Sequence, residues 1–430
     1  MAPVPAQEKL LQIHLHLRPT AMSVFRTVLP DKVLLSFCRQ HGVTFRHRFF
    51  TPLLTFWAFV AQCLEPDHSC RTAVAYALLW WRGRKAPGQR RNRPVAEHSN
   101  DTGAYCKARA RLPETLIPAM SRHVGRTLDQ RVGESEKLWG RDVYLADGTC
   151  LSMPDTPQLT QAFGKSSGGR RGAKTSVFPI ARAVALISLY TGAVVEAAVG
   201  AYKTSEHVLF HGLWKGAEWL RGAVLVGDRL YGSFAHLALL SQQGTDVISR
   251  LHGRRPTDLR QGKSLGPGDR LVIWHRVGPW PPWLAPEANL PETLSLRLIR
   301  VRSRLRGFRP KEIFLVTTLL DPKCYKAQDI ANLYLRRWEM EVDLRHMKSV
   351  LQLDVFRGKS PDIVRKEFWT HLVVYNLVRS VMWEAAASHA LSPSGLEFQR
   401  HAPAPQYLRT QHRRRPLFTL GPQTPQGAAA

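Results

Sequence analysis

The hydrophobic pattern divides the chain into a first part with helical periodicity and a central part typical of buried strands. In the first part, apolar residues recur at helical spacing, most clearly in the segment after Thr51 and Pro52. A proline is tolerated in the first turn of a helix, and Ser69 is placed to cap the next helix. We therefore expect a helical domain over residues 1–135.

From Arg141 onward the period changes to that of strands. Residues 143–146 form a short apolar run that ends in Asp147, Gly148 and Thr149, which predicts a buried strand stopped by turn residues. Further elements are expected in the order strand (150–153), hairpin (177–190 and 193–199), helix capped by Thr204 or Ser205, inner strand (223–227) ending at Asp228, helix (234–241) and strand (247–250).

A long β-like stretch separates Asp228 from the next helical pattern. It is too long for a loop, so we expect a folded β insertion at about 252–322, with strands over 271–277, 294–301 and 313–319. Its tryptophans (Trp274, Trp280, Trp283) could stack on a displaced base, although two of the three are more readily explained as core. Its arginines make it very basic: Arg297, Arg300, Arg302, Arg304, Arg306 and Arg309.

The net charge of the chain indicates the class of partner that it binds. Lys and Arg number 61 against 33 Asp and Glu, a net charge of +28, while a hydrophobic fraction of 44% is ordinary for a globular protein. Such an excess indicates a polyanion, and nucleic acid is the default. Basic residues also gather at 82–93, in a Gly-rich segment at 164–174, and as Lys107, Arg109 and Arg111 in a predicted helix over 105–112. Each segment suits DNA contact, and a solvated charged surface or a mobile loop is the alternative.

The sequence disfavours a membrane protein, a secreted protein and a zinc site at its cysteines. No apolar run is long enough to span a bilayer, and polar residues interrupt the N-terminus early, so we expect no membrane association and no signal peptide. None of the six cysteines forms a C-x-x-C pair. Cys63, His68 and Cys70 lie close together without a matching second ligand pair, which argues against zinc there. Scattered reduced cysteines fit a cytoplasmic protein.

One later helical segment concentrates the candidate chemistry. Residues 334–348 contain no Pro or Gly, and on a helical wheel Tyr334, Arg337, Glu341 and Lys348 share an arc of about 60° beside an apolar stripe. A plain amphipathic helix with an Arg337–Glu341 pair is the alternative interpretation.

The spacing Y-x2-R-x3-E-x6-K at these four positions resembles the motif of DDE transposases of bacterial insertion sequences, in the insertion-sequence-four group named for Y-R-E-K. The segments 228–233 (D-R-L-Y-G-S) and 105–113 resemble the same family. The resemblance implies a ribonuclease H-like α/β catalytic domain (136–385) with a β-rich insertion, preceded by the helical, basic DNA-binding domain and followed by helices, including one over 371–383. A basic, largely disordered tail is expected over 386–430.

The resemblance also implies the chemistry. Asp147, Asp228 and Glu341 would be the catalytic residues and would bind two Mg²⁺ ions about 4 Å apart, with Mn²⁺ as a substitute. Tyr334, Arg337 and Lys348 would contact the DNA backbone of the element's ends. The expected function is cleavage of double-stranded DNA at inverted-repeat ends and strand transfer into target DNA, by a nucleoid-associated homodimer on paired ends. A DNA-binding protein with a vestigial centre, or a metal-dependent nuclease of the same fold without strand joining, is the alternative.

Overall fold

The structure is a computed structural model that describes the chain apart from residues 1–23, 45–48, 84–100, 167–175, 254, 256–258, 304–310, 338–346, 348–350, 389–417 and 420–430. The chain forms two compact units. Unit 1 consists of Met1–Leu128, Ser152–Ala162 and Met347–Pro393, and unit 2 consists of Asp129–Leu151, Phe163–His346 and Ser394–Ala430. In the described part of the chain, no helix is both long and apolar enough to cross a membrane.

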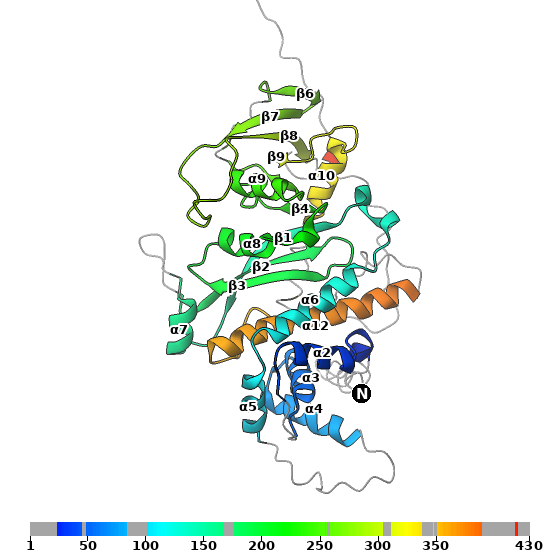
Figure 1. The fold of residues 1–430 in the computed structure, drawn as a ribbon, viewed down its shortest axis with the longest axis vertical. Helices are drawn as coiled ribbons and strands as arrows, with labels where there is room; N and C mark the ends of the chain where they lie inside the picture. The colour runs from blue at the N-terminus through cyan, green and yellow to red at the C-terminus, as the bar shows by residue number, and fades with distance from the viewer. Residues whose placement is uncertain are drawn as a thin grey trace, which may run out of the picture. The chain divides into compact units, whose positions relative to one another are not determined.

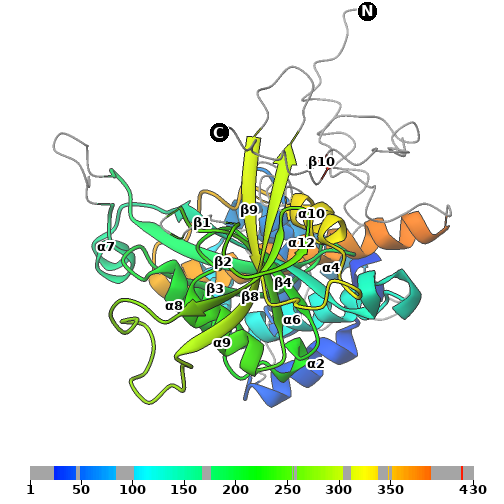
Figure 2. The same cartoon turned by 90° about the horizontal axis from the view of Figure 1, so that it is seen from above.

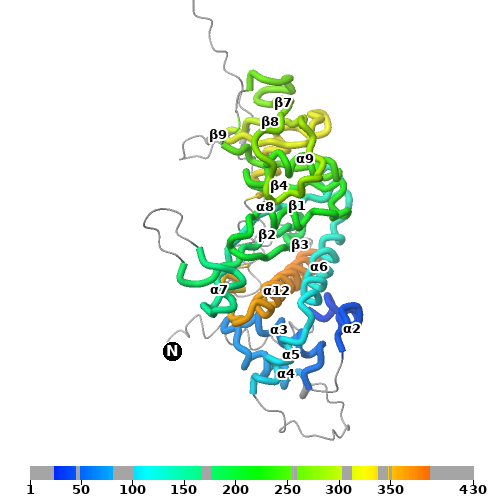
Figure 3. Tube along the Cα trace, turned by 60° about the vertical axis from the view of Figure 1, so that its left-hand side comes forward, coloured from blue at the N-terminus to red at the C-terminus, as the bar shows by residue number. Residues whose placement is uncertain are grey.

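Unit 1 is helical, as the sequence predicts. The predicted Ser69 cap is present, since Ser69 Oγ accepts a hydrogen bond from the Thr72 N–H at 3.1 Å. The Thr51 side chain also caps α3 by accepting a hydrogen bond from the Leu54 backbone N–H. Helix α3 contacts α4, α5 and α12, and Figure 3 shows these helices gathered around it. The helices that lie wholly or mainly in this unit are α2 (Asp31–Gln40), α3 (Pro52–Leu64), α4 (Cys70–Gly83), α5 (Gly103–Arg111), α6 (Leu116–Asp129), α7 (Pro157–Phe163) and α12 (Pro361–Ser388).

One of the basic residues expected to face DNA is instead part of this core. Arg109 on α5 is only 8% exposed, and its Nη1 donates to Gln62 Oε1 at 2.9 Å. Tyr105, also buried, donates to the same oxygen at 2.7 Å. Lys107 and Arg111 are exposed. The alternation of charge along α5 therefore does not mark a single DNA-facing surface.

Unit 2 is built on one large sheet with the order β3-β2-β1-β4-β5-β9-β8-β7-β6 (Figure 1). Strands β1, β4 and β5 are parallel, whereas β2 pairs with β3, and β9 with β5, in antiparallel fashion. The short strand β10 pairs with β8. The strands are β1 (Val143–Ser152), β2 (Ile180–Ser188), β3 (Val194–Ala201), β4 (Val224–Gly227), β5 (Asp246–Arg250), β6 (Lys263–Gly266), β7 (Asp269–His275), β8 (Thr293–Ser303), β9 (Lys311–Thr317) and β10 (Phe418–Thr419).

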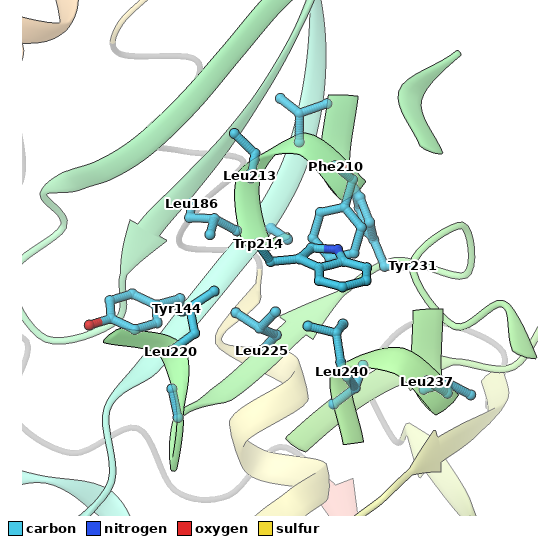
Figure 4. Close-up of a cluster of buried hydrophobic side chains, with 14 of the residues drawn as sticks. Tyr144, Leu186, Phe210, Leu213, Trp214, Leu220, Leu225, Tyr231, Leu237 and Leu240 are labelled. Carbon is cyan, nitrogen blue, oxygen red and sulfur yellow. The ribbon is translucent and has the colours of Figure 1, made fainter. Parts of the chain in front are cut away.

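Two helices cover one face of this sheet and fix its core. Ser205 caps α8 and Ser233 caps α9 through their side-chain oxygens. Phe210 and Trp214 of α8 join the sheet residues Tyr144 and Leu225 in one buried cluster (Figure 4). The helices of unit 2 are α8 (Glu206–Trp214), α9 (Phe234–Gln242) and α10 (Ala327–Leu335), with 3-10 helices η2 (Glu134–Glu136), η3 (Leu138–Gly140) and η4 (Glu218–Leu220).

The structure corrects one strand boundary. Asp147, Gly148 and Thr149 do not end the first strand, because β1 continues without a break to Ser152. The separate strand predicted for 150–153 is thus the second half of β1. Ser152 itself bridges to Val355, its N–H donating to the Asp354 carbonyl at 2.9 Å. Turn propensity is a weak preference, and pairing with neighbouring strands overrides it here.

The strands expected in the insertion are present as β7, β8 and β9, and they extend the same sheet because β9 pairs with β5. Figure 2 shows β8 and β9 running side by side. The tail prediction concerns residues that lie almost wholly outside the described part of the chain. The predicted domain boundaries stay a prediction.

Candidate active site

The pairing of β1 with β4 brings two of the predicted acids to the same edge of the sheet. The parallel register aligns Val143 with Val224 and continues to Ala146 opposite Gly227. Asp147 follows Ala146 within β1, and Asp228 comes directly after the end of β4. Adjacent strands lie about 4.8 Å apart, so the two carboxylates belong to one locality. In agreement with this, the negative charge of Asp228 contributes to raising the pKa of Asp147.

The surroundings of the Asp147 carboxyl group disfavour its charged form. Its pKa is raised to about 6: burial is the largest cause, the Gly148 N–H and the Arg337 guanidinium lower the pKa, and the charges of Asp228 and Glu206 raise it. Oδ1 accepts a hydrogen bond from the Gly148 N–H at 2.9 Å. Arg337 Nη1 lies 3.8 Å from Oδ2. The single positive charge of Arg337 therefore does not offset the rise in this pKa that burial and the two neighbouring carboxylates cause.

The backbone around Asp228 is fixed by a tight turn. Asp228 Oδ1 accepts from the Leu230 N–H at 2.7 Å, and its carbonyl oxygen accepts from Ser249 Oγ at 2.5 Å. Gly227 and Gly232 permit the close approach, since a Cβ would lie 2.5 Å from a Tyr231 ring carbon or 2.6 Å from Ser249 Oγ, respectively. The turn sequence therefore holds this aspartate directly after the strand.

A third carboxylate, Glu206, stands beside these two and was not predicted. It begins α8, and its Oε1 accepts the Tyr231 hydroxyl hydrogen bond at 2.5 Å. A Cβ added to Gly148 would lie 2.4 Å from Glu206 Oε1, so this carboxylate rests against the backbone next to Asp147. In the sequence Glu206 follows the N-cap Ser205, where an acid is ordinarily explained by the helix dipole. The placement of Gly148 opposite it is the observation that reveals it.

Two residues of the Y-R-E-K pattern reach the same site. Tyr334 is 7% exposed, and the Arg337 side chain hydrogen-bonds to its hydroxyl group. Burial raises the pKa of Tyr334, the charges of Arg337 and Arg250 lower it, and that of Asp228 raises it. Tyr334 and Arg337 thus lie near both aspartates.

The remaining two residues of the pattern, Glu341 and Lys348, lie outside the described residues. Helix α10 ends at Leu335, so the continuous helix expected from Tyr334 onward is interrupted at Arg336. The meeting of Glu341 with Asp147 and Asp228 stays a prediction.

An aromatic stack adjoins Glu206. His207 Nδ1 lies 3.0 Å from His236 Nε2, and the ring of Trp283 stacks on His236 with centroids 4.4 Å apart. Trp274, Trp280 and Trp283 all pack against a buried cluster around Phe234 and Leu284. This arrangement fits the core interpretation of the insertion tryptophans.

The arginines of the insertion are not a uniform basic surface. Arg297 is 1% exposed and pairs with Asp269 through two hydrogen bonds, Nε to Oδ1 at 2.8 Å and Nη2 to Oδ2 at 2.5 Å. Arg300 and Arg302 both lie within 3.5 Å of Glu312. Arg297 therefore stabilises the sheet instead of contacting DNA, which corrects the expectation from charge alone. The other three, Arg304, Arg306 and Arg309, lie outside the described residues.

Comparison with known proteins shows that the chain is similar to transposases of insertion sequences. The sequence model of the family described as Transposase DDE domain matches residues 138–377. The chain is 26% identical over 368 residues to the transposase InsG for insertion sequence element IS4 of Escherichia coli (strain K12), covering 83% of this chain and 76% of that protein. It is also 28% identical over 105 residues to the putative transposase InsZ of the same strain, covering 24% of this chain and 34% of that protein. A 70-residue stretch is 29% identical to the transposase for insertion sequence element IS421 of Escherichia coli, covering 16% of this chain and 19% of that protein.

Proposed function

Since the chain belongs to the DDE transposases, and among them to the IS4 type, we propose that it cleaves DNA at the inverted-repeat ends of an insertion sequence and joins the freed strand to target DNA. The observation that carries this proposal is the position of Asp147 and Asp228 directly after paired residues of two parallel strands. We further propose a ribonuclease H-like fold for the catalytic part, and the order β3-β2-β1-β4-β5 with three parallel strands supports it.

The donors at this site suit a hard divalent cation. Asp147 and Asp228 offer oxygen atoms only, and at the half-buried Asp147 the single positive charge of Arg337 does not offset burial and two neighbouring carboxylates. We propose that both aspartates, with Glu341, would hold two Mg²⁺ ions, for which Mn²⁺ would substitute. When bound, Mg²⁺ supplies Lewis-acid stabilisation of the charge on the attacking and leaving oxygens of a phosphodiester.

The residues of the chain supply orientation and binding. The Gly148 N–H fixes one oxygen of Asp147, which leaves the other toward Arg337. Tyr334, Arg337 and Lys348 are proposed to contact the phosphate backbone of the element's end. Arg337 would then lie between a phosphate and Asp147 and hold the phosphate next to the carboxylates. The net charge of +28 supports the binding of both end and target DNA, by a homodimer on paired ends.

The test is cleavage of a supercoiled plasmid that carries the inverted repeats flanking the gene. With Mg²⁺, the wild-type protein should yield nicked, excised and joined products. Asp228→Asn and Glu341→Gln should keep end binding in a mobility-shift assay and lose all three products. Asp142→Asn is the matched control, because Asp142 precedes the opposite end of β1 and pairs with Lys137 at 2.9 Å.

Each other outcome has a distinct meaning. Binding without cleavage by the wild-type protein would favour a vestigial centre, and cleavage without joined products would favour a nuclease. Undiminished nicking by either acid variant would remove that residue from the active site.

A further inference from the structure

A second group of ligand-type side chains lies in unit 1, within the helical core. His68, Glu367 and His371 each offer a ligand atom, and these atoms all lie within 4.8 Å of one another. The three residues are 3%, 2% and 1% exposed. They come from two segments, the turn between α3 and α4 and the helix α12, which are roughly 300 positions apart in the sequence.

Three of the four histidine ring nitrogens of this group have no hydrogen-bond partner among the described residues. Both ring nitrogens of His371, and Nδ1 of His68, are buried without a hydrogen bond. Buried polar atoms are nearly always satisfied, so such atoms need an explanation, and a bound ion is one.

The surroundings orient each ligand. Glu367 and His371 are four residues apart on α12 and so lie on the same face of the helix. The Glu367 oxygens accept hydrogen bonds from the backbone N–H groups of Arg357 at 2.9 Å and Gly358 at 2.8 Å. These bonds leave further lone pairs on the carboxylate, and outer partners of this kind are typical of metal-ligating carboxylates.

His68 is held by its backbone. Its φ is +48°, in the left-handed region that residues other than glycine seldom adopt. Gln62 Nε2 donates to the His68 carbonyl oxygen at 2.8 Å, while Gln62 Oε1 is occupied by Tyr105 and Arg109. A strained backbone conformation persists where the surrounding structure fixes it, and here it turns the ring toward His371, with ring centroids 5.0 Å apart.

We propose that His68, Glu367 and His371 bind one divalent transition-metal ion of the Zn²⁺ class. Two imidazole nitrogens and one carboxylate oxygen form a ligand set that zinc accepts, whereas Mg²⁺ prefers oxygen alone. The alternative is that Glu367 only stabilises the turn at 357–358 and the histidines are ordinary core residues. That explanation accounts for Glu367 but leaves the ring nitrogens unsatisfied.

The ion would link α12 to the turn after α3, and α12 already packs against α3 within unit 1 (Figure 3). Its role is structural, because a metal-bound native state is stabilised over an unfolded chain in which these distant ligands are separated. The sequence alone shows His68 near Cys63 and Cys70 without a second ligand pair. The helix α12 supplies that pair.

The experiment uses the full-length protein without DNA, so its result is independent of transposition. Metal content is measured by mass spectrometry after purification, and thermal unfolding is followed with added Zn²⁺ or Mg²⁺ after chelation. The wild-type protein should carry one zinc per chain and lose it to a chelator with a lower Tm. Zn²⁺ should restore the full Tm, whereas Mg²⁺ alone should restore only part of it. Co²⁺ should bind with the visible absorption of a four- or five-coordinate site.

His371→Phe keeps an aromatic ring in the core and removes one ligand, and Glu367→Gln removes the charge. Both should bind less than a tenth of the wild-type zinc, and their Tm should not respond to Zn²⁺. His275→Ala, at an exposed position in unit 2, should behave as the wild type does. If the wild-type protein binds neither Zn²⁺ nor Co²⁺, or if His371→Phe retains full zinc content, the proposal is wrong. The wild-type measurement decides the matter even if a variant does not fold.

Discussion

Replacing Asp147 with asparagine should stabilise the metal-free protein while abolishing cleavage. The reason is the setting of the carboxyl group, which is 22% exposed and lies beside the charges of Asp228 and Glu206. A pKa raised to about 6 means that folding favours the neutral acid. Asparagine retains the shape of the neutral acid and the oxygen that accepts the Gly148 N–H, without the charge.

The magnitude follows from proton linkage. The ordinary pKa is 3.8, and each pH unit of difference corresponds to about 1.4 kcal/mol, so the charged form costs about 3 kcal/mol above pH 7. A group whose pKa is raised by folding stabilises fully below its unfolded pKa and loses that contribution as the pH rises through the folded value. The advantage of Asp147→Asn should therefore be small near pH 4, about half developed at pH 5, and about 3 kcal/mol at pH 7.5.

The assay is thermal or urea unfolding of both proteins in metal-free buffer at pH 5 and pH 7.5. For a unit of this size, about 3 kcal/mol corresponds to a Tm difference of roughly 6 °C. Added Mg²⁺ should raise the Tm of the wild-type protein and have little effect on Asp147→Asn. The matched control is Asp246→Asn: Asp246 is paired with Arg141 at 2.7 Å, and its replacement should destabilise at both pH values.

A clear result would refute this reasoning. If Asp147→Asn is less stable than the wild-type protein at pH 7.5 without divalent ions, the carboxylate is satisfied in the fold. The argument from uncompensated burial would then fail, and with it the strongest physical reason to place a cation there.

Three further predictions concern other residues of unit 2. Glu206→Gln should fold, since its amide oxygen can still accept from Tyr231, but should need several-fold more Mg²⁺ for half-maximal nicking; an unchanged Mg²⁺ titration would make Glu206 purely structural. Arg297→Ala should destabilise by about 3–5 kcal/mol in urea unfolding because it leaves Asp269 buried and unpaired, and an Arg297→Met, Asp269→Leu double variant should recover part of that loss. Arg337→Gln should weaken end binding and reduce the slope of log K against log salt by about 1, and an unchanged slope would show that Arg337 contacts no phosphate.

The elements that could be predicted are those with local causes. The helix after Thr51 and Pro52 is specified by a cap and a proline in its first turn, and β4 by an apolar run between turn residues. The placement of Asp228 directly after β4 holds for the same reason, whereas Asp147 follows an apolar run but lies inside β1 and does not end it. The extent of β1 could not be predicted, because pairing along its second half decides it and not the Asp-Gly-Thr composition.

The burial of charged residues could not be read from the sequence either. Arg109 and Arg297 resemble their exposed neighbours in every local respect, and only tertiary packing places Gln62 beside the first and Asp269 beside the second. Counting arginines therefore overstates the surface available to DNA. Glu206 escaped notice in the opposite way, because a helix cap is a sufficient local explanation for an acid that the fold places against Gly148.

The two proposed ion sites differ in chemistry, and this difference makes metal-removal experiments informative. The site at Asp147 and Asp228 offers oxygen atoms at the edge of a sheet, where an ion must come and go with substrate oxygens. The site at His68, Glu367 and His371 offers mainly nitrogen within a closed helical core, where an ion would remain. A chelator removes both ions, so loss of activity after chelation does not by itself identify a catalytic metal. Mg²⁺ added back alone can refill only the oxygen site. Cleavage that returns with Mg²⁺ while the Tm stays below that of the zinc-loaded protein would therefore separate catalysis in unit 2 from stability in unit 1.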